Sequence, residues 1–153
     1  MNSGSNAFAM ISALADRLGL GPVAAGEDGV SIFSFEEVDV LVAADEEAIT
    51  LFARLGEAPS QEDAGFAESL LSANLFWRDT DGATLSLEPF SRIVILARRL
   101  PVTALASEQA LEAALERFAQ SAIDWTRTVD RLRRGGADGV SAQPPHPPSI
   151  DRA

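Results

Sequence analysis

The side chains best suited to catalysis are scarce in this sequence. Its only histidine, His146, lies in the run PPHPP near the C-terminus, where no neighbouring element would hold the imidazole in place. Nucleophilic catalysis requires a serine, threonine or thiol with a base held beside it. Because there is no cysteine and the one histidine stands in a proline-rich segment, we expect neither a nucleophilic enzyme nor a thiolate metal site.

Carboxylates are abundant, but they occur in short runs typical of turns. The run DTDG at residues 79–82 places two aspartates beside a glycine, as calcium loops do. An EF-hand loop needs another oxygen ligand at its fifth position, where this sequence has Ala83, and a glutamate at its twelfth. Adjacent carboxylates at 36–37, 45–47 and 62–63 fall between or at the ends of predicted elements, where solvated charge explains them better than acid–base chemistry. The sequence therefore predicts no catalytic residue, no metal and no cofactor.

Charge and hydropathy narrow the classes of partner. There are 23 acidic residues against 12 basic ones, a net charge of −11, and every basic residue is arginine. Nucleic-acid binding requires a basic surface that phosphates can reach, so neither nucleic acid nor an anionic membrane is an expected partner. No run approaches the roughly 18 apolar residues of a membrane span, and the N-terminal residues lack the pattern of a signal peptide. We therefore expect a cytoplasmic protein.

The chain length of 153 residues suits one compact domain, which we predict over residues 5–134. Residues 135–153 are rich in glycine and proline and cannot bury enough apolar surface to offset chain entropy, so we expect a disordered tail. Charge is uneven along the chain: residues 1–90 carry 16 acidic and 3 basic side chains, net −13, whereas residues 91–153 carry 7 and 9, net +2. The acidic surface therefore belongs to the N-terminal part of the domain.

Hydrophobic periodicity predicts an α+β domain. Helical spacing, strand-like alternation and breaks at glycine or proline give the order helix, three strands, helix, two strands, helix. The predicted elements cover residues 5–18, 30–35, 38–44, 47–55, 60–77, 83–87, 92–100 and 107–134. Strands joined by such short links pair antiparallel. We therefore expect one antiparallel sheet with three helices.

The first three predicted strands are apolar on both faces. In the first of them, Val30 and Ile32 point to one side, and Phe33 and Phe35 point to the other. Three helices cannot cover both faces of a five-stranded sheet. Something else must cover the remainder, since exposed apolar patches on the order of a few hundred Å² mark interaction sites.

Residues 70–102, LLSANLFWRDTDGATLSLEPFSRIVILARRLPV, and residues 111–125, LEAALERFAQSAIDW, resemble the CesT or Tir-chaperone family, the class I chaperones of type III secretion. The family pattern is a helix ending in a Leu-Leu-x-x-Asn-Leu-like phrase, a glycine turn, a Leu-x-Leu strand, a strand ending in Arg-Leu-Pro, and an amphipathic helix with a phenylalanine and a tryptophan. The matching residues here are Leu70, Leu71, Asn74, Leu75, Gly82, Leu85, Leu87, Arg99, Leu100, Pro101, Phe118 and Trp125. Their order and spacing carry the resemblance, while the short link 36–37 and the proline-rich tail depart from the pattern.

This resemblance implies a homodimer in the bacterial cytoplasm that binds an N-terminal segment of a secreted effector protein. It implies that the segment is kept soluble, extended and competent for export, without ATP. The dimer interface is expected on the second helix and the following strand, at Leu75, Phe76, Trp77, Leu85 and Leu87. The effector site is expected on the first helix and the first strands, at Phe8, Met10, Phe33, Phe35 and Val40.

Two alternatives accompany this interpretation. Phe33 and Phe35 could form the core beneath a helix instead of a binding surface. The whole domain could also be a protein-binding module of the same fold outside secretion, such as a YbjN-like adaptor. In either function the acidic N-terminal part should favour a partner segment that carries arginine or lysine.

Overall fold

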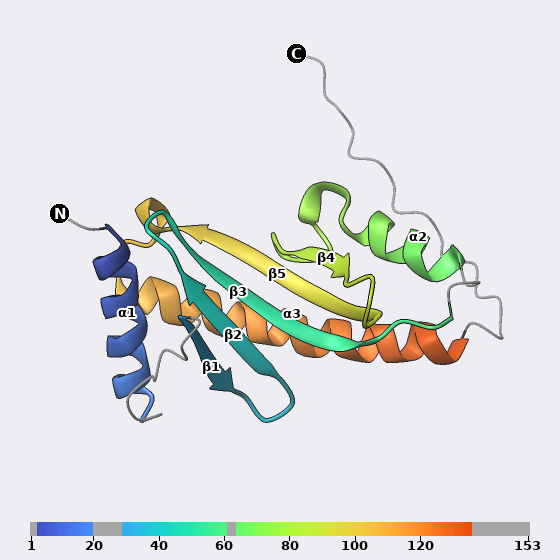
Figure 1. The fold of residues 1–153 in the computed structure, drawn as a ribbon, viewed down its shortest axis with the longest axis horizontal. Coiled ribbons are helices and arrows are strands. Elements are labelled where there is room, and N and C mark those ends of the chain that lie inside the picture. Colours follow the sequence, from blue (N-terminus) through green and yellow to red (C-terminus); the bar gives the residue numbers. More distant parts are fainter. Residues whose placement is uncertain (1–2, 20–28, 61–63, 136–153) are drawn as a thin grey trace, which may run out of the picture.

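The computed structural model describes residues 3–19, 29–60 and 64–135 and has the predicted α+β architecture. Within these ranges, three α-helices accompany a five-stranded antiparallel sheet (Figure 1). The helices are α1 Ser3–Arg17, α2 Ala64–Ala73 and α3 Glu108–Gly135, with short 3-10 helices η1 Leu75–Trp77 and η2 Val102–Ala104. The strands are β1 Val30–Ser34, β2 Asp39–Ala44, β3 Ala48–Glu57, β4 Thr84–Leu87 and β5 Ile93–Pro101. Gly135, the first residue of the predicted tail, ends α3. Residues 136–153, which include His146, and residues 61–63 near the predicted start of the second helix lie outside the described residues.

The strands lie in the order β1-β2-β3-β5-β4, and short polar turns join the first three into the predicted meander. In the turn between β2 and β3, the Asp45 carboxylate accepts hydrogen bonds from the backbone N–H groups of Glu47 and Ala48, both at 2.8 Å. Arg99 of β5 also donates to Asp45 at 2.8 Å. These bonds, above all the one from Glu47, hold the pKa of Asp45 below its usual range. The acidic link is therefore an ordered turn that is tied to the neighbouring strand.

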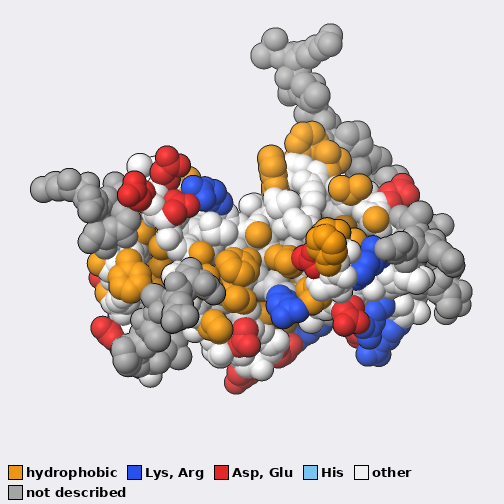
Figure 2. Space-filling view, viewed as in Figure 1, with side chains coloured by type: hydrophobic (Ala, Val, Ile, Leu, Met, Phe, Trp, Pro, Cys, Tyr) orange, Lys and Arg blue, Asp and Glu red, His pale blue; other side chains and the backbone are white. Residues whose placement is uncertain are grey.

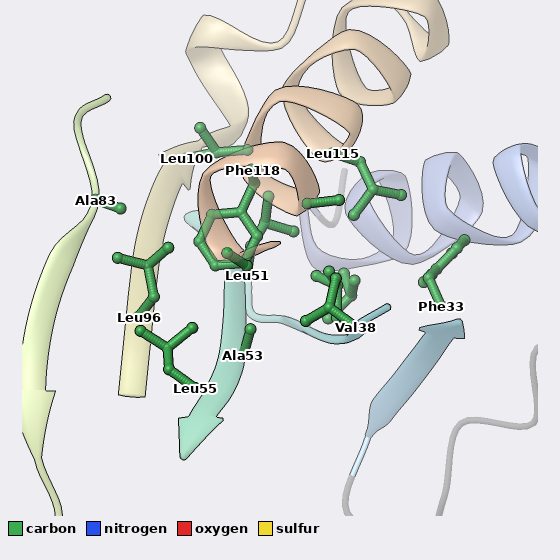
Figure 3. Close-up of a cluster of buried hydrophobic side chains, with 14 of the residues drawn as sticks. Phe33, Val38, Leu51, Ala53, Leu55, Ala83, Leu96, Leu100, Leu115 and Phe118 are labelled. Atoms are coloured by element: carbon green, nitrogen blue, oxygen red, sulfur yellow. The ribbon is translucent and has the colours of Figure 1, made fainter. Parts of the chain in front are cut away.

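One face of the sheet forms the core with α3. An apolar stripe in steps of three and four runs along α3, as predicted, and its buried members are Leu111, Leu115, Phe118, Ala119, Ala122 and Val129. Figure 3 shows Phe118 between its helix and the strand residues Leu51 and Leu96. Full burial of each such side chain stabilises the fold by about 1.5–3 kcal/mol. In Figure 1 the sheet lies in front of α3, so the face toward the viewer is the one that α3 leaves uncovered.

The amphipathic helix α1 packs against α3 and β2 at the β1 end of the sheet (Figure 1). Ile11 and Leu14 are buried there, and Arg17 forms an ion pair with Glu112 of α3. Phe8 lies at the edge of the buried stripe and is 44% exposed. None of the helices in the described residues is long and apolar enough to cross a membrane. α1 thus extends the core and leaves one aromatic side chain at its rim.

The second helix is shorter than the sequence predicted. The α-helix ends at Ala73 instead of continuing to Trp77, and the chain then forms η1. Phe76 and Trp77 have left-handed backbone conformations, with φ of 57° and 52°. The prediction was wrong because the apolar periodicity continues through Phe76 and Trp77, whereas the chain turns at Asn74, whose side chain bonds to β4.

The run DTDG at 79–82 forms the predicted tight turn. Asp81 pairs with Arg117 of α3 at 2.6 Å and lies 3.9 Å from Arg98 of β5. The buried Thr80 hydroxyl donates to the carbonyl of Ala83, and Gly82 has a φ of +82°, which favours glycine. Among the described residues, no group of three or more histidine, cysteine or acidic side chains could hold a metal ion. The carboxylate of Asp81 therefore anchors a turn to the helix and the sheet.

The turn between β4 and β5 is held by Glu88. Its carboxylate accepts hydrogen bonds from the backbone N–H groups of Phe90, at 3.0 Å, and Ser91, at 2.6 Å, and from the Ser91 hydroxyl. The hydroxyl bond is the largest of the causes that hold the pKa of Glu88 below its ordinary value of 4.5. Arg92 closes the turn in a left-handed conformation with φ of 60°.

We predict that Glu88→Gln destabilises the protein at neutral pH and that this difference disappears in acid. The lowered pKa means that the charged carboxylate contributes stability above about pH 4.5, which is lost as the pH falls through the folded-state value. Urea unfolding of both proteins from about pH 7 to about pH 3 measures the difference. Glu116→Gln, at an exposed position of α3, is the matched control. A difference that stays constant across the range would contradict the prediction.

Candidate partner-binding surfaces

The face of the sheet away from α3 carries a row of apolar side chains, which we call the open face. The strand register places Ile32 beside Leu41, and Leu41 beside Phe52. Phe52 in turn lies beside Ala97 of β5. Ile32 is 63% exposed, while Leu41 and Phe52 are half-buried. Figure 2 shows hydrophobic side chains gathered over the middle of this face, so the predicted uncovered apolar surface is present.

The two edges of the sheet differ in what covers them. At the β4 edge, the side-chain amide of Asn74 donates to the Leu85 carbonyl at 2.9 Å and accepts from the Leu85 N–H at 2.8 Å. Trp77 Nε1 also donates to Thr84 Oγ1 at 3.2 Å. At the opposite edge, β1 pairs with β2, and no other strand of the described residues pairs with it. Since an edge strand with free backbone groups is a template for another strand, β1 is the edge at which one can be added.

The residues predicted for the effector site divide between surface and core. Phe8 is exposed, and Met10 and Phe35 are half-buried. Phe33 is 2% exposed and Val40 is 0% exposed, so neither is available to a partner. This corrects their assignment to a binding surface: strand alternation directs both side chains into the core with α1 and α3.

Ile32, Leu41 and Phe52 take the place of the two buried residues in the candidate site. They were overlooked because apolar residues occupy both faces of these strands, so alternation alone cannot tell which face is covered. The alternation did place Ile32 and Phe33 on opposite faces of the sheet, and this was the one sign in the sequence that only one of them could face a partner. Only the position of α3 shows that the Ile32 side is the open one.

A second exposed apolar surface lies on α2 and η1, and we call it the η1 surface. Leu71, Leu75, Phe76 and Trp77 are 72%, 56%, 65% and 55% exposed, respectively. The left-handed backbone of the two aromatic residues costs on the order of 1 kcal/mol each, and such strain clusters at functional sites. The η1 surface therefore combines four large apolar side chains with a strained backbone that presents two of them.

Leu85 and Leu87 of β4, also predicted at the dimer interface, do not belong to the η1 surface. Leu85 is 4% exposed and pairs with the buried Leu96, so it faces the core. Leu87 has the same orientation and is half-buried. Burial corrects the assignment of Leu85, because the strand period of two turns it inward while Thr84 and Ser86 face outward. The interface role of Leu87 stays a prediction.

Acidic side chains lie at both ends of the β1–β3 meander. Glu36 and Glu37 are exposed in the turn between β1 and β2, and Asp45, Glu46 and Glu47 are exposed in the turn between β2 and β3. Arg127 of α3 donates to both carboxylate oxygens of Glu37, at 2.9 and 2.8 Å, and Arg99 of β5 pairs with Asp45 at 2.8 Å and with Glu47 at 3.7 Å. Glu36 and Glu46 form no ion pair in the described residues, so each end of the meander keeps one unpaired negative charge.

The sequence model of the Tir chaperone protein (CesT) family matches residues 9–126, well over half of the chain. The chain belongs to this family. Among its relatives, a Tir chaperone of Citrobacter freundii is 25% identical over 102 residues, and one of Escherichia coli O157:H7 is 24% identical over 95 residues. These matches cover 65% and 61% of the chain, which spans 65% and 60% of the two relatives.

Solved structures share the fold of this CesT-family chain. The crystal structure of the ExsC–ExsE complex contains a chain that matches with a TM-score of 0.68 at 22% identity, over 84% of this chain and 97% of the other. A chain of the HopA1–SchA chaperone–effector complex matches with a TM-score of 0.61 at 18% identity, over 85% and 96%. The order of helices and strands predicted from the sequence agrees with this fold.

We predict that Asn74→Ala destabilises the protein by about 1–3 kcal/mol, because two hydrogen bonds to Leu85 are lost at once. Urea unfolding measures the loss, and amide hydrogen exchange at Leu85 should become faster. Asn6→Ala, at an exposed position of α1, should change neither quantity. Unchanged exchange at Leu85 would mean that Asn74 does not protect the β4 edge in solution.

Proposed function

We propose that this protein is a type III secretion chaperone that binds the N-terminal segment of a secreted effector and keeps it soluble, extended and competent for export without ATP. The observation that carries the proposal is the open apolar face, which adjoins the unpaired edge of β1 in the same small domain. The names of its relatives support it, since two are Tir chaperones and a protein of similar fold occurs in a chaperone–effector complex.

The effector segment binds as an added strand beside β1. Main-chain hydrogen bonds along the edge supply affinity with little demand on the effector sequence. Alternate side chains of the added strand fall on the open face, beside Ile32 and Leu41. Phe8, Met10 and Phe35 add apolar surface at this end of the domain. Affinity thus comes from hydrogen bonds and apolar burial, so neither a catalytic residue nor a cofactor is part of the proposal.

The acidic turns make the site selective for an effector segment with arginine or lysine. Residues 1–90 carry a net charge of −13, and the turns at both ends of the meander are exposed. Complementary charge speeds the encounter and discriminates against acidic segments more than it adds affinity. The effect therefore weakens as salt is added.

The homodimer forms through the η1 surface. Monomeric soluble proteins rarely expose contiguous large apolar side chains, and here Leu75, Phe76 and Trp77 follow one another directly. Asn74 covers the β4 edge beside them, so this contact packs side chains together instead of pairing strands. Burial of these aromatic residues against a second copy would give the interface an apolar centre.

We predict that Ile32→Asp weakens effector binding at least tenfold and shifts the melting temperature by only a few degrees, because the 63% exposed side chain contributes little to the core. Isothermal calorimetry with the N-terminal segment of the effector encoded beside the chaperone gene measures affinity. Ala113→Asp, at an exposed position of α3, is the matched control and should bind normally. If Ala113→Asp lost binding and Ile32→Asp did not, the effector would bind at α3 and not on the open face.

We predict that Trp77→Glu halves the molecular mass at micromolar concentration, because a charge at the centre of an apolar interface has no partner. Sedimentation velocity measures the mass. Leu18→Glu, which places the same charge at an exposed apolar position directly after α1, should leave the dimer intact. A wild-type protein that sediments as a monomer at this concentration would contradict the proposed homodimer.

A further inference from the structure

Phe90, at the tip of the turn between β4 and β5, is 95% exposed, more than any other large hydrophobic side chain of the described residues. It belongs neither to the open face nor to the η1 surface. A solvent-exposed phenylalanine gains nothing in the folded domain, because its ring loses no contact with water. The ring is therefore fully available to a partner that could bury it.

The turn that carries Phe90 is held rigidly. Glu88 bonds to the backbone on both sides of the tip, and its own N–H donates to the carbonyl of Ile93 at 2.9 Å. The Arg92 carbonyl accepts from the N–H of Ala58 at 2.7 Å, which fixes the turn to the end of β3. Because these bonds fix the backbone of the turn, the place from which the Phe90 ring projects is set before binding, and less backbone entropy is lost when a partner binds.

A groove of about 250 Å³ lies between the end of β3 and the C-terminal part of α3. Leu55, Gly56 and Val129 form its apolar floor, and Thr126 and Arg133 are among the residues at its rim. The strand register shifts at Gly56, and a Cβ added there would lie 3.7 Å from Val129, so the missing side chain keeps the groove open. A cavity of about 150 Å³ holds benzene, so the groove has room for a phenyl ring.

We propose that Phe90 of one molecule inserts into the groove of a second copy of this chain. Glu88 lies next to the anchor, and Arg133 at the groove forms no ion pair within the described ranges, so these two side chains can pair. Glu57 and Asp130 also line the groove; Asp130 is paired with Arg134 at 2.9 Å, whereas Glu57 forms no ion pair in the described residues. The anchor and the groove therefore fit each other in size and apolar character, and Arg133 is available to Glu88.

The anchor and the groove lie at the same end of the domain. Glu57, which lines the groove, pairs with Ile93 at the start of β5, directly after the turn that carries Phe90. Two molecules related by a twofold axis can therefore exchange anchors, each filling the groove of the other, and the contact closes as a pair. This contact is separate from the η1 surface and leaves the open face free, so it joins two dimers while effector segments stay bound.

Sedimentation of the full-length protein from micromolar to several hundred micromolar tests the proposal. The wild-type mass should at least double over this range, because each η1 dimer carries two anchors and two grooves. Phe90→Ser should weaken the association by at least about thirtyfold, as expected for a buried aromatic anchor. Thr126→Trp should do the same, because the indole covers a half-buried position at the rim and blocks the groove. Arg133→Glu should weaken it by about fivefold.

Matched variants outside the contact should associate as the wild type does. Phe8→Ser removes an exposed phenylalanine from α1, Ala113→Trp adds an indole to α3, and Arg131→Glu reverses an exposed charge of α3 that does not line the groove. An equimolar mixture of Phe90→Ser and Thr126→Trp restores part of the association, because a mixed pair keeps one intact anchor and one intact groove. Misfolded variants could not complement each other in this way.

Three results would overturn the proposal. The first is a wild-type mass that does not change over the concentration range. The second is association that Phe90→Ser and Thr126→Trp leave intact. The third is a Thr126→Trp variant that still associates as the wild type does but no longer binds the effector, which would assign the groove to the effector. None of these outcomes bears on the η1 dimer, because Trp77→Glu reports on that dimer at micromolar concentration.

Discussion

The packing of the α3 stripe against one face of the sheet is the contact on which the rest of the structure depends. Buried residues of β3 and β5 alternate with more exposed ones along much of these strands, and α3 packs against both strands. A single helix of 28 residues covers one face and cannot reach the other. The open face, with Ile32 at its rim, is therefore a direct consequence of how the core forms.

The two edge strands of the sheet, β4 and β1, differ in whether a side chain covers their backbone groups. At the β4 edge, one asparagine side chain imitates a strand by offering both a donor and an acceptor to Leu85. The same residue ends α2 and begins the strained turn that exposes Phe76 and Trp77. Protection of one edge and display of the η1 surface are thus two results of one local arrangement, whereas β1 has a single strand partner, β2, among the described residues.

The proposed activity requires no chemistry beyond binding, and the distribution of side chains agrees with that. Asp45 and Asp81, which belong to the runs that first suggest acid–base or calcium chemistry, instead hold turns, between β2 and β3 and before β4. Glu88 holds the turn between β4 and β5 in the same way. Each accepts hydrogen bonds or forms an ion pair that orders a connection between strands or helices. The ordered turns keep the apolar surfaces in fixed positions relative to one another, which is what a binding protein of this size needs.

Local patterns in the sequence determined the element order, the antiparallel sheet, the apolar stripe of α3 and the family, because these depend on periodicity and short links along the chain. The sequence also predicted that some apolar surface stays uncovered, but not which surface. Tertiary structure decided that Phe33 and Val40 are core while Ile32 is exposed, since both faces of the strands are apolar and only the helix position distinguishes them. It also decided that α2 ends at Ala73, because the bonds that turn the chain there come from β4, eleven residues away from Asn74.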